Sequence, residues 1–91
     1  MRKLILLAAI GMARAIVAEG RGSVVRFGAR EAGTITAEAF DVTGRRVAVL
    51  FAGSVDGGEV REAELSGVAS GVYFVRVSGR VGAETARVVV R

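Results

Sequence analysis

The sequence predicts a small all-β domain, folded as a β-sandwich of about six to seven strands. Short runs rich in Val, Ile, Phe and Tyr recur from residue 23 to residue 90, and turns that contain glycine separate them. Regularly spaced short strands with turn signals between them are typical of a β-sandwich. The chain has no proline to interrupt such strands.

Strict alternation identifies one strand most clearly. In the run at 34–41, Ile35, Ala37 and Ala39 share one side and polar residues occupy the other. This period of two predicts a half-buried strand with the apolar side facing the core. The polar run at 59–65 is predicted to be an edge strand. The predicted strands are 23–27, 34–41, 46–52, 59–65, 72–78 and 83–90.

The run at 72–78 is predicted to be the most buried strand. It follows Gly71 and combines β-branched with aromatic residues, which favour strands. Successive side chains of a strand point to opposite faces. The inward residues would be Tyr73, Val75 and Val77, and the outward residues Phe74 and Arg76.

A tight turn is predicted between the strands at 34–41 and 46–52. Asp41 can accept hydrogen bonds from backbone N–H groups two residues further on, and Gly44 can adopt a positive φ. The chain would therefore reverse here and form a hairpin. Arg45, directly after the glycine, would pair with Asp41, cap strand carbonyls or contact a partner.

The 91 residues allow one small domain. Hydrophobic residues make up 52% of the chain, but it has only four Phe, one Tyr and no Trp, so the core must consist of Val, Ala, Leu and Ile. Domains of this size commonly have only about 3–5 kcal/mol of stability. The absence of cysteine excludes disulfides as reinforcement.

The net charge of +4 does not predict a nucleic-acid partner. Arg2, Lys3 and Arg14 lie in the N-terminal segment, and from Ile16 onward ten basic residues face nine acidic ones. The remaining arginines are scattered along the sequence and form no basic stripe with interleaved aromatic residues.

The N-terminal segment is predicted to be a signal peptide at Met1–Ala15. It has a basic start, an apolar run and the small residues Ala13 and Ala15, which offer a cleavage site. Ala18 is a second possible end point. The apolar run is shorter than the about 20 residues that span a bilayer, so no stable transmembrane anchor is predicted. The alternative is an apolar helical segment that packs on the sandwich.

The sequence gives no indication of catalysis, and we expect the protein not to be an enzyme. It has neither His nor Cys, the commonest general base and the best nucleophile. Glu62 and Glu64 share one side of a predicted strand, which is interpreted as a solvated edge. Asp56 and Glu59 are interpreted as turn residues and not as calcium ligands. No catalytic, cofactor-binding or metal-binding residue is predicted, no cofactor is expected, and neither is a small-molecule substrate.

Two stretches carry a family resemblance: Phe40–Leu50 (FDVTGRRVAVL) and Gly71–Val77 (GVYFVRV), followed by a last strand that ends at Val88–Arg91 with a basic residue. Together they resemble the C-terminal sorting domain of the type IX secretion system and the related immunoglobulin-like module of flagellar hook-capping proteins. The resemblance covers roughly residues 23–91. It implies an immunoglobulin-like arrangement of two packed sheets in a module at 22–91.

The resemblance also implies a function. The N-terminal peptide would take the chain across the inner membrane, and the outer-membrane secretion machinery would then recognise the folded domain. In that family a sortase-like component typically removes the domain, and cargo is retained at the cell surface or released. The implied recognition residues are Asp41, Gly44, Arg45, Gly71, Tyr73, Val88, Val90 and Arg91.

Two alternatives use the same fold. One is a small extracytoplasmic adhesion or binding module whose edge strand at 59–65 pairs with a partner strand. The other is a structural assembly domain like the hook-cap module. In either case the chain is a standalone protein or a fragment of a longer secreted one.

Overall fold

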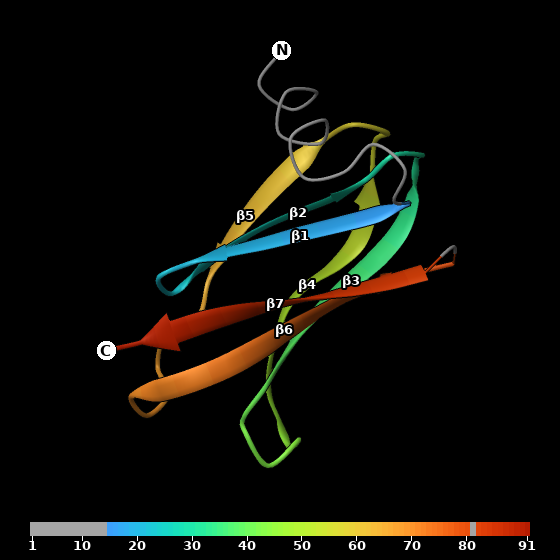
Figure 1. Ribbon diagram of the computed structural model, residues 1–91. Coiled ribbons are helices and arrows are strands. Elements are labelled where there is room, and N and C mark those ends of the chain that lie inside the picture. Colours follow the sequence, from blue (N-terminus) through green and yellow to red (C-terminus); the bar gives the residue numbers. More distant parts are fainter. Residues whose placement is uncertain (1–14, 81) are drawn as a thin grey trace.

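The computed structural model describes residues 15–80 and 82–91, and these form an all-β fold of two antiparallel sheets (Figure 1). One sheet has the strand order β1-β2-β5 and the other β4-β3-β6-β7, an arrangement compatible with a β-sandwich. The predicted signal peptide and the alternative N-terminal helix lie outside the described residues, apart from Ala15. The strands are β1 (Ile16–Arg21), β2 (Val24–Ala29), β3 (Gly33–Phe40), β4 (Arg46–Val55), β5 (Val60–Glu64), β6 (Gly71–Gly79) and β7 (Gly82–Val90).

The core lies between the two sheets and draws side chains from both. Phe27 is its largest fully buried side chain, and Leu65 and five valines are the next largest. The alternating patterns of β3 and β6 are confirmed, because their predicted inward residues are all buried and Phe74 and Arg76 are exposed. The core is therefore built mainly from Val, Ala, Ile and Leu, as the composition predicts, but it also contains the aromatic residues Phe27 and Tyr73.

All six predicted strands are present, with ends that differ by up to three residues. The seventh, β1, was not predicted. It pairs with β2 from Ile16 opposite Ala29 to Arg21 opposite Val24. Ile16 and Val17 directly follow the apolar N-terminal run, and no turn residue marks where a strand begins.

The position of β1 changes the boundaries of the folded unit. The sheet begins at Ile16, before the start at Gly22 that the sequence suggests. Ile16 belongs to the core cluster and Ala18 packs against it, so β1 contributes to the core. Ala18, the second candidate end of the signal peptide, lies within β1 opposite Phe27.

The two sheets meet closely along β1 and β7. A Cβ atom on Gly20 would overlap the backbone carbonyl of Arg87, and the Val89 N–H donates to the Gly22 carbonyl over 2.8 Å. Only glycine permits this approach of two backbones. On the opposite side, β4 and β5 are the edge strands, which confirms the predicted edge position of β5.

Candidate recognition site

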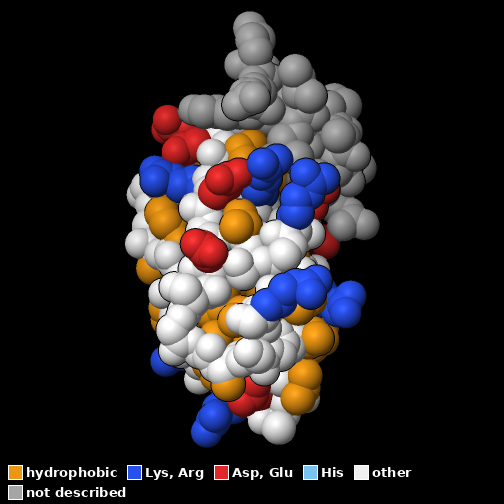
Figure 2. Space-filling model, turned by 90° about the vertical axis from the view of Figure 1, so that its left-hand side faces the viewer, with side chains coloured by type: hydrophobic (Ala, Val, Ile, Leu, Met, Phe, Trp, Pro, Cys, Tyr) orange, Lys and Arg blue, Asp and Glu red, His pale blue; other side chains and the backbone are white. Residues whose placement is uncertain are grey.

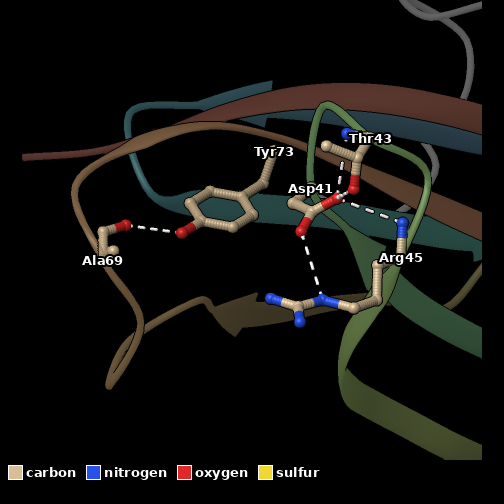
Figure 3. Close-up of polar contacts among 5 residues, drawn as sticks. All are labelled: Asp41, Thr43, Arg45, Ala69 and Tyr73. Atoms are coloured by element: carbon tan, nitrogen blue, oxygen red, sulfur yellow. Dashed lines mark hydrogen bonds and ion pairs between the residues drawn. The ribbon is translucent and has the colours of Figure 1, made fainter.

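The turn between β3 and β4 is organised by one carboxylate (Figure 3). Oδ1 of Asp41 accepts hydrogen bonds from the Thr43 hydroxyl at 2.6 Å, the Thr43 N–H at 2.9 Å and the Arg45 N–H at 3.1 Å. The main chain closes the same turn, because the Gly44 N–H donates to the Asp41 carbonyl over 3.0 Å and the Asp41 N–H donates to the Arg45 carbonyl over 2.9 Å. The predicted turn is confirmed.

These donors stabilise the ionised form of the carboxylate. The Thr43 hydroxyl and the Arg45 N–H, and to a lesser degree the charge of Arg45, hold the pKa of Asp41 below its usual value. Gly44 has a φ of +88°, in the region that residues with a Cβ rarely adopt. The primary role of Asp41 and Gly44 is therefore to shape the turn.

Arg45 combines two of the roles that the sequence left open. Its Nε lies 3.4 Å from Oδ2 of Asp41, so the predicted ion pair forms. Its side chain nevertheless remains 79% exposed. The guanidinium can therefore bind a partner without unfolding the turn, since it has N–H donors beyond the one that faces Asp41.

Tyr73 is held in the core. Its side chain is buried, and its hydroxyl donates to the Ala69 carbonyl over 2.6 Å (Figure 3). This bond fixes the segment between β5 and β6 to the beginning of β6. Tyr73 therefore stabilises the site from within the core, and its ring is not accessible to a partner.

The register of β6 and β7 brings the remaining candidates together. Gly71 lies opposite Val90 and Tyr73 lies opposite Val88. Val88 is buried and Val90 is half-buried, whereas Arg91 is exposed just beyond the end of β7. Among these residues of β6 and β7, Arg91 is the one with a charged side chain, and that side chain is exposed to solvent.

All eight predicted residues gather at one end of the four-stranded sheet. Phe40, the last residue of β3, lies opposite Phe74, near the beginning of β6. The Asp41–Arg45 turn therefore leaves the sheet at the same end as the beginning of β6 and the end of β7 (Figure 1). Segments that are about 30 to 50 residues apart in the sequence thus form one surface region.

One exposed residue of this region was not identified from the sequence. Val42 lies in the turn between Asp41 and Thr43 and is 71% exposed. An apolar residue inside an otherwise polar turn is the signal that could have identified it, because such turns normally contain Gly, Asn, Asp and Ser. Val42 adds an apolar contact point beside Arg45.

A hollow of about 340 Å³ lies elsewhere in the molecule. Ile35 and Gly79, which lie opposite each other at the other end of β3 and β6, line it together with Glu31 and Arg80. It is therefore separate from the eight candidate residues. Within residues 15–80 and 82–91, no three His, Cys, Asp or Glu side chains form a group that could hold a metal ion. No helix in that part of the chain is long and apolar enough to cross a membrane.

Comparisons of the chain with models of known protein families, with curated proteins and with solved structures find no match. The class that the structure defines is an all-β protein of two antiparallel sheets. The resemblance to sorting domains therefore depends on the residues of 40–50, 71–77 and 88–91 themselves.

Proposed function

We propose that the chain is a non-enzymatic C-terminal sorting module that directs export and cell-surface attachment through type IX secretion. The supporting observation is that the motif residues, distant in sequence, converge at one end of the four-stranded sheet. A recognition signal needs such a joint surface, whereas residues needed only for separate turns and strands have no reason to gather. The fold in this proposal is an immunoglobulin-like sandwich preceded by a signal peptide at Met1–Ala15.

The contact residues of the proposal are the exposed ones. Arg45 offers a guanidinium, Val42 an apolar side chain and Arg91 a second cation at the end of β7. Asp41, Gly44 and Tyr73 hold these groups in place through the hydrogen bonds described above. The partner is the protein secretion machinery at the outer membrane, and export proceeds from the periplasm to the surface.

A reporter fusion tests the proposal. Residues 15–91 contain all seven strands, so they are placed behind an established signal peptide and a fluorescent protein. A fusion that starts at Gly20 would lack the buried Ile16 and Val17. The fusion is expressed in a host with type IX secretion and in a mutant that lacks the translocon. Surface or medium fluorescence that disappears in the mutant is the expected result.

Variants localise the signal. Arg45→Gln should reduce surface fluorescence, and Arg30→Gln is the matched control because Arg30 is exposed in the turn between β2 and β3. Fluorescence that stays in the periplasm of both hosts would contradict the proposal. Equal effects of the two variants would show that the turn carries no signal.

A second candidate function is a small extracytoplasmic binding, adhesion or assembly module. The observation that favours it is that β5 is an edge strand, whose outer backbone groups are free to pair with another strand. Periplasmic retention of a folded fusion would favour this candidate. The Leu65 N–H donates to the Ser23 carbonyl beside β2, so by alternation the N–H of Glu62 faces outward. A proline at Glu62 should then abolish partner binding while export stays unchanged, because proline cannot donate a backbone hydrogen bond.

A further inference from the structure

The strand register of the four-stranded sheet aligns four residues in a row across the sheet. This row is not evident from the sequence. Arg46, Phe40, Phe74 and Arg87 are successive partners across β4, β3, β6 and β7. Their sequence neighbours on β3, β6 and β7 are buried in the core, so the row lies on the outer face of the sheet. Two phenylalanines at the centre of the sheet are thus flanked by an arginine on each side.

Arg76 adds a third cation to this face. It lies two residues after Phe74 and therefore points to the same side of β6. Phe74 is 37% exposed, and Arg76 and Arg87 are exposed as well. We call Phe40, Arg46, Phe74, Arg76 and Arg87 the Arg–Phe face. Figure 2, a view from the side at which the chain ends, shows arginine and apolar side chains next to one another on the surface.

The cations of this face are only partly compensated. Arg46 donates to Glu38 over 2.8 Å but stays 58% exposed. Within the described part of the chain, Arg76 and Arg87 form no ion pair. Glu38, which also lies opposite Arg76 on this face, is one carboxylate against three arginines, so the face combines net positive charge with exposed aromatic surface.

The three-stranded sheet differs from the Arg–Phe face in the pairing of its charges. There Arg26 pairs with Glu62, and Arg61 lies 3.0 Å from Glu59. Two arginines on the strands of that sheet are thus paired with a glutamate, whereas Arg21 on β1 is not paired within the described residues. Unpaired arginines therefore occur outside the Arg–Phe face as well, and what distinguishes this face is that its arginines flank two phenylalanines in one row across the sheet.

We propose that the Arg–Phe face binds an acidic segment of a partner protein in which two carboxylates flank an apolar side chain. Neighbouring strands lie about 4.8 Å apart, so Arg46 and Arg87 are about 14 Å apart across the sheet. An extended peptide that crosses the strands covers this distance in about four residues. Acidic residues at positions i and i+4 would reach the two arginines, and an apolar residue at i+2 would contact Phe40 and Phe74.

Two other anionic partners fit this face less well. The apolar side chains lie within a sheet face and do not protrude, so they cannot enter a bilayer as an interfacial anchor must. A single-stranded nucleic acid needs a basic track along one side of the stacked bases, whereas here cations lie on both sides of the phenylalanines. Both partners are outcomes of the test below.

The test measures fluorescence anisotropy with the full chain and a labelled nine-residue peptide. The peptide carries glutamate at positions one, five and nine, phenylalanine at three and seven, and serine elsewhere. Its control replaces every glutamate by glutamine. The double variant Arg46→Gln/Arg87→Gln should bind the acidic peptide about tenfold more weakly, the sum expected for two exposed charge pairs. The glutamine peptide should bind weakly to both proteins.

The matched control is Arg21→Gln/Arg30→Gln, which removes the same charge from exposed positions outside the face. It should bind as the unmodified chain does, and circular dichroism should be the same for all proteins. Phe74→Ser should weaken binding without changing net charge. The proposal fails if the peptide does not bind, if both double variants weaken binding equally, or if a 20-residue oligothymidylate or phosphatidylglycerol vesicles bind more tightly than the peptide. This inference goes beyond the proposed function, because the assay needs no secretion system.

Discussion

The two long sides of the fold are closed in different ways. Along β1 and β7 the sheets meet through their backbones, with Gly20 against the carbonyl of Arg87 and a hydrogen bond between Val89 and Gly22. Along β4 and β5 the sheets meet through side chains. There the ring of Phe51 lies 5.6 Å from that of Phe27, and the Arg61 guanidinium lies 5.0 Å from the Phe51 ring.

This difference predicts that the two sides of the fold tolerate substitutions to different degrees. A backbone contact leaves no space for even one added carbon atom. A single substitution on the β1–β7 side should therefore cause a large loss of stability. A side-chain contact is a sum of many weak attractions, so the β4–β5 side should lose stability gradually. The four predictions below test this comparison in order of expected effect.

Gly20→Ala should destabilise the protein most, by about 3 kcal/mol, because the new Cβ atom overlaps a carbonyl that can move only if β7 moves. Urea unfolding of the full chain measures the free energy. Gly33→Ala is the control, since no atom lies within 4 Å of its added Cβ, and it should change stability by less than about 0.5 kcal/mol. Equal effects would show that the backbone contact is not tight.

Phe51→Ala should cost about 2 kcal/mol, less than the roughly 3–5 kcal/mol of a fully buried aromatic residue, because Phe51 is half-buried. Phe74→Ala is the matched control on the outer face, where the ring contributes less to the core. It should cost under about 1 kcal/mol. A larger loss for Phe74→Ala in the same urea experiment would refute the assignment of the two rings.

Arg61→Gln should cost about 0.5 kcal/mol, the size of an exposed cation–π contact. Arg61 also pairs with Glu59, so a double-mutant cycle with Phe51→Leu separates the two contributions. The expected coupling energy between Arg61 and Phe51 is a few tenths of a kcal/mol. Zero coupling would mean that the ion pair accounts for the whole effect.

Asp41→Asn should have its effect only above acidic pH. The pKa of Asp41 is lower in the folded protein than in the unfolded chain, because the Thr43 hydroxyl and the Arg45 N–H stabilise the carboxylate. The carboxylate therefore stabilises the turn that leads into β4 above the unfolded pKa of about 3.9, and this contribution is lost as the pH falls through the lower folded value. Urea unfolding at pH 6 and at pH 2.5 compares the two proteins. A stability difference that is the same at both pH values would contradict the role of the charge.

Local sequence patterns were sufficient to predict most of the fold. Alternation placed Ile35, Ala37 and Ala39 in the core, and the Asp41 and Gly44 pair located the hairpin turn, because both features depend on residues within a few positions of each other. β1 was missed because Ile16 and Val17 continue an apolar run, and hydrophobicity alone does not show where a strand begins. The exposure of Val42 could have been inferred from its polar turn.

The eight candidate residues were predicted individually, but their convergence was not. The sequence contains Asp41, Gly71 and Val90 without indicating that they share one end of a sheet. That depends on strand order and on the pairing of Phe40 with Phe74 and of Gly71 with Val90. A shift of one residue in either pairing would turn the opposite face of a strand outward.

By itself the sequence determined an all-β chain, the inward faces of β3 and β6 and a turn fixed by a carboxylate. These properties follow from side-chain alternation and from local hydrogen bonding, which act over a few residues. Only the tertiary structure decided that β1 joins the sheet, that Gly20 meets Arg87 and that Arg46 and Arg87 flank two phenylalanines. These features require contacts between residues far apart in the chain, and such contacts are set by packing the whole core at once.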